Sequence, residues 1–207
     1  MTSSLDPARW AALCRGLGLE DLEEIFLRLQ RSHGQRHRKY HNAQHVNDCL
    51  ALLDASTHPA ARDPLVEMAI WFHDAVYSTF SSRNEERSAE WARKVLLSAG
   101  SGAEAADSVA SLILATRHAE PPVLPDHQLL VDIDLSILGA SPERFRCFEE
   151  QIRAEFWWVP SKMYRKKRRS VLRAFADRRY IFATEEIRDR FESRARANLE
   201  KALAALS

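Results

Sequence analysis

Apolar residues recur at intervals of three and four along most of this 207-residue chain, which is the spacing of one face of an α-helix. Near the N-terminus, for example, Leu22, Ile25, Phe26 and Leu29 follow this spacing. The chain holds only six glycines, which also favours helix. One short apolar run, residues 129–138, resembles a strand, but no second strand is available to pair with it. The pattern therefore predicts an all-α protein.

Capping residues and prolines divide this pattern into separate helices. Asp6-Pro7 is a typical helix start, and we expect the first helix to continue to about residues 32–34. Thr184, followed by two glutamates, is expected to cap the last helix. The other predicted helices cover residues 42–57, 64–77, 84–99, 103–118, 129–138, 141–159 and 161–179. We expect one domain, residues 1–207, with its functional core at about 36–140 and the helices of 141–207 packed on it.

Composition restricts the class of protein. The apolar runs are short and interrupted by charge, so we expect no segment that spans a membrane. The first ten residues lack the basic start and apolar core of a secretory signal, and a cytoplasmic location is expected. Cys14, Cys49 and Cys147 are odd in number and lie in apolar patterns, which predicts buried, reduced thiols.

Charge is distributed unevenly along the chain. From residue 151 onward there are 15 basic and 7 acidic residues, whereas the rest of the chain is acidic. The densest basic stretch consists of Lys162, Arg165, Lys166, Lys167, Arg168, Arg169 and Arg173. It could bind nucleic acid or guide an anionic substrate, but a solvated helix face is the preferred interpretation. Phe156, Trp157 and Trp158 are expected to be core or interface aromatics.

Several polar residues occur in strongly apolar surroundings. His73 and Asp74 follow Ile70-Trp71-Phe72, and the run 129–135 contains Asp132 and Asp134. A buried carboxylate is costly unless it is paired or binds a metal ion. His41 and His45 are four residues apart and would share a helix face. Convergence of these groups predicts a divalent-metal site. Taken singly, His73-Asp74 could be a hydrogen-bonded core pair, and Asp132 could cap a helix.

These residues lie in segments similar to those of the HD-domain superfamily of metal-dependent phosphohydrolases. The similarity is greatest to a bacterial group of predicted HD phosphohydrolases. The matching segments are RKYHNAQHV (38–46), WFHDAVY (71–77), NEERSA (84–89), DIDLSILG (132–139) and ARANL (195–199). The resemblance implies an all-α HD-type domain. It also implies that His45, His73, Asp74 and a late aspartate bind one divalent ion, which could be Mn, Fe, Co, Ni, Mg or Zn. Asp134 is the expected fourth ligand, and Asp132 is its rival.

Further roles follow from this assignment. Asp74 would orient a metal-bound water, and Glu85 is the candidate general base, although a solvated first-turn glutamate is an equal interpretation. His118 could act as a general acid, a phosphate donor or a ligand of a second metal ion; a surface or capping role is the alternative. The candidates for contacting substrate are Arg38, Tyr40, His41, Asn42 and Asn84.

We therefore expect a metal-dependent hydrolase that acts on a nucleotide or another small phosphate ester. One alternative is an HD-type oxygenase with two irons, for which His118 and His127 would be the extra histidines. The other is a helical protein that binds RNA or a protein partner and keeps a vestigial metal site. The chain could be a monomer or a homodimer.

Overall fold

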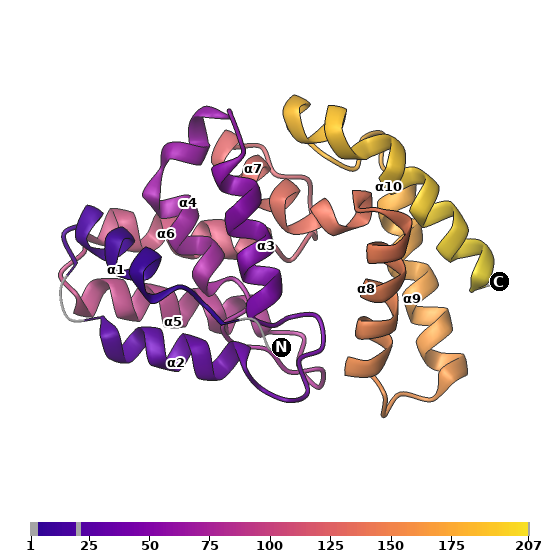
Figure 1. The fold of residues 1–207 in the computed structure, drawn as a ribbon, viewed down its shortest axis with the longest axis horizontal. Coiled ribbons are helices and arrows are strands. Elements are labelled where there is room, and N and C mark those ends of the chain that lie inside the picture. Colours follow the sequence, from indigo (N-terminus) through magenta and orange to yellow (C-terminus); the bar gives the residue numbers. More distant parts are fainter. Residues whose placement is uncertain (1–3, 20–21, 207) are drawn as a thin grey trace. The chain divides into compact units, whose positions relative to one another are not determined.

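The structure is a computed structural model that describes residues 4–19 and 22–206. These residues form ten α-helices and two short 3-10 helices, with no strand among them, so the predicted all-α fold is confirmed (Figure 1). No helix in these ranges combines the length and apolarity needed to cross a membrane. The chain divides into two compact units, residues 1–131 and 132–207, with the boundary inside helix α7 (Pro125–Leu135). The predicted packing of residues 141–207 on the core stays a prediction.

The first predicted helix is in fact two helices. Helix α1 (Pro7–Gly16) begins as expected, because the Asp6 carboxylate accepts the amide hydrogens of Ala8 and Arg9. Helix α2 (Glu23–His33) follows after a break. Gly18 adopts a left-handed φ of 67°, and the amide of Leu19 returns to the carbonyl of Cys14, which closes the end of α1. Apolar residues keep a helical spacing across this break, so the sequence pattern did not indicate it.

Helix α4 (Pro64–Phe72) is the central helix of the first unit. All residues from Met68 to Phe72 are fully buried, which confirms the burial predicted from the apolar composition of this segment. α4 packs against α3 (Ala43–Asp54), α5 (Asn84–Ser98) and α6 (Ala103–Ala115), and α5 and α6 lie side by side (Figure 1). The short 3-10 helix η1 (Pro59–Arg62) precedes it. The predicted starts of α3 and α5 near Asn42 and Asn84 are confirmed.

The predicted helix at 64–77 is too long. α4 ends at Phe72, and His73 is its C-cap, so Asp74 lies in the turn that follows. Arg38 donates to the carbonyls of Asp74 and Ala75, and the Ser88 hydroxyl accepts the amide hydrogen of Val76. These long-range bonds hold the turn in a non-helical path. α6 likewise ends earlier than predicted, and His118 follows it with a left-handed φ of 54°.

The second unit contains the last residues of α7 and the helices that follow it. These are η2 (Ser136–Gly139), α8 (Pro142–Glu155), α9 (Ser161–Ala176) and α10 (Glu185–Ala205). α10 packs against η2 and α9. Gly139 allows a close approach, since a Cβ built there would lie 2.6 Å from the backbone oxygen of Phe191. α8 and α9 both end a few residues before their predicted ends.

Two burial predictions need correction. Cys14 and Cys49 are buried free thiols as expected, but Cys147 is exposed on α8. Burial raises the pKa of Cys14 to about 11, so this thiol stays protonated and unreactive. The prediction that Trp157 and Trp158 lie in a core or an interface is not met within this chain, since 75% and 40% of their surfaces are exposed.

Candidate metal centre

Three of the four predicted ligands come together in the first unit. Nε2 of His45 lies 3.0 Å from Nε2 of His73. One carboxylate oxygen of Asp74 lies 3.3 Å from the same atom of His73 and 3.6 Å from that of His45. Both histidines are 3% exposed. The two histidines are 28 residues apart in the sequence. Their Nε2 atoms and the Asp74 carboxylate nevertheless point at one another.

The local bonds favour ligand chemistry for these groups. Nδ1 of His73 lies 2.8 Å from the carbonyl of Ile70, to which a neutral ring donates its hydrogen. This assignment leaves the lone pair of Nε2 directed at His45 and Asp74. Burial alone would raise the pKa of Asp74, but His73, His41 and His45 hold it well below its ordinary range. Asp74 is therefore a carboxylate anion at neutral pH.

The spacing of the three groups fits a metal ion. Ligand atoms about 2.1 Å from a metal ion, and at right angles to one another, lie about 3.0 Å apart. The distances of 3.0, 3.3 and 3.6 Å correspond to that angle or to somewhat wider ones. Imidazole nitrogen with carboxylate oxygen is a donor set that suits Mn, Fe, Co, Ni and Zn.

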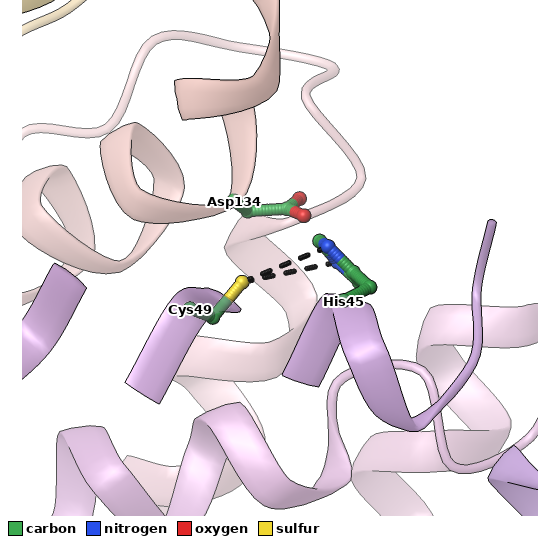
Figure 2. A group of neighbouring side chains, drawn as sticks. All are labelled: His45, Cys49 and Asp134. Carbon is green, nitrogen blue, oxygen red and sulfur yellow. Dashed lines mark hydrogen bonds between the residues drawn. The ribbon is translucent and has the colours of Figure 1, made fainter. Parts of the chain in front are cut away.

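Cys49 is a neighbour of the centre that the sequence did not single out. Figure 2 shows Cys49 one turn after His45 on α3, with its sulfur 3.8 Å from Nδ1 and 3.9 Å from Nε2 of the ring. The four-residue spacing on one helix was the available signal. Contact with a buried thiol restricts the rotation of the His45 ring.

Arg38 positions the turn that carries Asp74. Only 5% of Arg38 is exposed, and its guanidinium donates to the carbonyl of Asp74 at 2.5 Å and to that of Ala75 at 3.1 Å. Its Nε also donates to the side chain of Gln35. These bonds to two backbone carbonyls and to Gln35 make Arg38 a fixed support for Asp74. Its expected contact with substrate phosphate stays a prediction.

The other substrate candidates fall into two groups. Tyr40 and His41 lie beside the centre. The ring centroids of Tyr40 and His45 are 4.7 Å apart, and His41 stacks on Tyr77 with 4.2 Å between ring centroids. Asn42 and Asn84 use their side chains on the backbone. Asn42 caps α3 and also bonds to the carbonyl of Lys39, and Asn84 bonds to both backbone groups of Ser78. These bonds account for both asparagines without a ligand.

Glu85 lies near the centre on the first turn of α5. Burial raises its pKa, and the charge of Asp74 adds to the effect. The adjacent Glu86 pairs with Arg117 at 3.2 Å, which holds the segment just before His118 beside the start of α5. Glu85 therefore has the environment of a proton acceptor, and the role of His118 stays a prediction.

Asp132 and Asp134 differ in their surroundings. In the second unit, the Asp132 carboxylate accepts hydrogen bonds from the amides of Ala183 and Thr184 and from the Thr184 hydroxyl. Thr184 is the N-cap residue of α10 as predicted, but its hydroxyl bonds to Asp132 and does not cap the helix. These bonds explain Asp132 without a metal ion. Asp134, also drawn in Figure 2, lies on the last turn of α7, and its role as fourth ligand stays a prediction.

His127, one of the extra histidines of the two-iron alternative, has a hydrogen-bond partner at each ring nitrogen. Its Nε2 lies 2.8 Å from the hydroxyl of Ser111, and its Nδ1 lies 2.8 Å from the carboxylate of Asp126. Both ring nitrogens thus have partners within the first unit. Its role as a ligand of a second metal ion stays a prediction.

Comparison with known proteins does not add to this description: no family model, curated protein or solved structure matches the chain.

Proposed function

We propose that this chain is a divalent-metal-dependent hydrolase of small phosphate esters, with an HD-type centre formed by His45, His73, Asp74 and Asp134. One observation supports it most directly: the Nε2 atoms of two buried histidines lie 3.0 Å apart, with the Asp74 carboxylate beside both. The reaction itself rests on the resemblance of the sequence motifs to HD phosphohydrolases.

The residues of the chain would divide the work of the reaction. A bound divalent ion supplies acidity to a coordinated water and polarises a phosphoryl oxygen. Asp74, as an anion, would hold the ion and orient such a water. Glu85, whose pKa is raised, would accept its proton closer to neutral pH than an ordinary glutamate does. His41, which stacks on Tyr77, would contact the substrate.

A competing function is RNA binding through α9. Four basic residues of this helix, Lys162, Arg165, Lys166 and Arg169, line a hollow of about 440 Å³, which favours it. However, Arg168 pairs with Glu149, and Arg169 donates to the carbonyl of Leu206, so part of the basic stretch serves the second unit itself. The hydrolase is therefore the preferred function.

The test combines metal analysis with activity. We expect the purified chain to retain a divalent ion and to hydrolyse at least one of a panel of nucleotides and sugar phosphates. His73→Ala and Asp74→Asn should lose both metal and activity, whereas Asp107→Asn, an exposed carboxylate, should lose neither. Glu85→Gln should keep the metal and lose activity, with Glu90→Gln as its exposed control.

The outcomes separate the parts of the proposal. Full metal content in His73→Ala would show that the ligand assignment is wrong. A tightly bound metal without turnover of any phosphate ester would remove the hydrolase and leave the centre. Two irons per chain would favour the two-iron oxygenase. Salt-sensitive RNA binding that is abolished by neutralising Lys166 and Arg169 would favour the RNA-binding function.

A further inference from the structure

The first unit contains a polar hollow that the proposed reaction does not use. Its volume is about 520 Å³, within the range of small-molecule sites, roughly 300–1,000 Å³. It is lined from three directions: by α2 and the segment after it, by the turn after Asp74, and by α5. We call it the arginine hollow; its lining residues are Arg28, Arg31, Ser32, Gln35, Arg38, Ala75, Val76, Tyr77 and Trp91.

The arginine hollow carries three guanidinium groups and no carboxylate among its described lining residues. Arg28 and Arg31 are one turn apart on α2 and are exposed. Neither forms an ion pair within residues 4–19 and 22–206. Arg9, by contrast, pairs with both Asp54 and Glu67. An unbalanced cluster of this kind attracts an anion.

Two arginines of the hollow are held in place. The guanidinium of Arg28 lies over the ring of Trp91, 4.8 Å from its centroid. Stacking fixes the plane of a guanidinium and leaves the N–H groups at its edge able to donate. Arg38 is buried and fixed by backbone carbonyls, so its positive charge is part of the wall. These groups need little rearrangement to receive a ligand.

Neutral donors complete the set. The side-chain oxygen of Gln35 accepts a hydrogen bond from Arg38 at 3.0 Å, and this fixes the amide with its nitrogen free to donate. Ser32 adds a hydroxyl. The guanidinium edges of Arg28 and Arg31, together with these hydroxyl and amide donors, match the oxygens of a phosphate group, which accepts several hydrogen bonds and binds arginine in bidentate fashion, while Arg38 contributes its charge.

We propose that the arginine hollow binds the phosphate group of a small phosphorylated ligand. Because Arg38 forms part of its wall and also donates to the carbonyl of Asp74, the ligand contacts the support of the candidate metal centre. This site does not depend on the proposed reaction, and it stands whether or not the chain hydrolyses phosphate esters.

The experiment is a calorimetric titration of the metal-stripped full chain with inorganic phosphate, pyrophosphate and AMP. Stripping the metal removes any phosphate that a metal ion would hold. We expect saturable binding of one equivalent. Arg28→Gln and Arg31→Gln should each weaken binding by about tenfold, the loss of a charge-assisted hydrogen bond. Arg15→Gln, an equal charge change at the end of α1, should leave the affinity unchanged.

The same titration identifies both the ligand and the location. Tighter binding of AMP than of inorganic phosphate would support an organic phosphate as the occupant, and the reverse would support the free ion. NMR spectra of Arg28→Gln and Arg31→Gln identify the Nε–H signal of each arginine, because that signal disappears in its variant. Both signals should shift when the ligand binds to the parent chain. No saturable binding, equal weakening by Arg15→Gln, or weakening by Lys166→Gln in place of the α2 variants would overturn the proposal.

Discussion

Asp132 and Thr184 are joined by two hydrogen bonds: the amide and the hydroxyl of Thr184 both donate to one oxygen of Asp132, each at 2.7 Å. The other oxygen of Asp132 accepts the amide hydrogen of Ala183. A carboxylate in α7 thus satisfies amides at the start of α10, which have no carbonyl partner within that helix. Burial raises the pKa of Asp132, and these three bonds oppose the rise.

The bonds between Asp132 and Thr184 lead to different predictions for the Asn variants of Asp132 and Asp134. Asp132→Asn should lower the free energy of unfolding by about 2 kcal/mol, because it weakens charge-assisted hydrogen bonds, while metal content stays the same. Asp134→Asn should lower metal content with little loss of stability. Urea unfolding and metal analysis of both variants check the prediction. Metal loss in Asp132→Asn alone would exchange the two roles.

Arg38 provides a second prediction. Arg38→Met should lower the free energy of unfolding by about 3 kcal/mol, since the buried carbonyls of Asp74 and Ala75 lose their donor. It should also weaken metal binding, because the turn that carries Asp74 loses its support. Arg36→Met, at an exposed neighbour, serves as the control in the same unfolding and metal titrations. Unchanged metal affinity in Arg38→Met would show that Asp74 is positioned by other contacts.

Gly139 provides a test of packing in the second unit. In Gly139→Ala the new Cβ would meet the backbone oxygen and the Cβ of Phe191, each at 2.6 Å, so η2 or α10 must shift. We expect a loss of about 1–3 kcal/mol, the usual cost of overpacking. Gly16→Ala, where nothing lies within 4 Å, should leave stability unchanged or raise it slightly. Equal thermal melting of the two variants would contradict the close approach.

Local signals in the sequence predict much of this fold. The start of α1 at Asp6 and that of α3 at Asn42 follow from side chains that accept nearby amide hydrogens. The burial of α4 follows from its composition. The ends of helices were harder to predict, because distant bonds set them. α4 ends where Arg38, more than 30 residues earlier, holds the carbonyls of Asp74 and Ala75.

In the candidate site, too, some residues could be predicted from local sequence and others depend on distant contacts. His45, His73 and Asp74 could be found because charged or polar groups in apolar segments need a partner. The role of Arg38 could not, since an arginine beside a ligand motif suits a phosphate and a backbone clamp equally well. Asp132 and Asp134 are two residues apart in one apolar run, and only the bonds to Thr184 distinguish them.

His33 is a buried histidine that sequence reasoning missed. It is 1% exposed, and within residues 4–19 and 22–206 its ring nitrogens form no well-formed hydrogen bond, only a weak contact with the Trp71 backbone. Burial, together with the charge of Arg38, lowers its pKa to about 3. In the unfolded chain this ring has its ordinary pKa of 6.5. Between these two values the unfolded state binds one more proton than the folded state does.

Stability should therefore fall as the pH is lowered from about 6.5 toward 3, by up to about 1.4 kcal/mol per pH unit from His33 alone. His33→Leu removes this contribution and, because no well-formed hydrogen bond is lost, should not lower stability at pH 7. Urea unfolding at pH 7, 6, 5 and 4 would show a shallower decline in His33→Leu than in the parent chain. The exposed-residue variant His37→Gln should keep the parent slope, and identical slopes in His33→Leu and the parent would mean that His33 accepts its proton while folded.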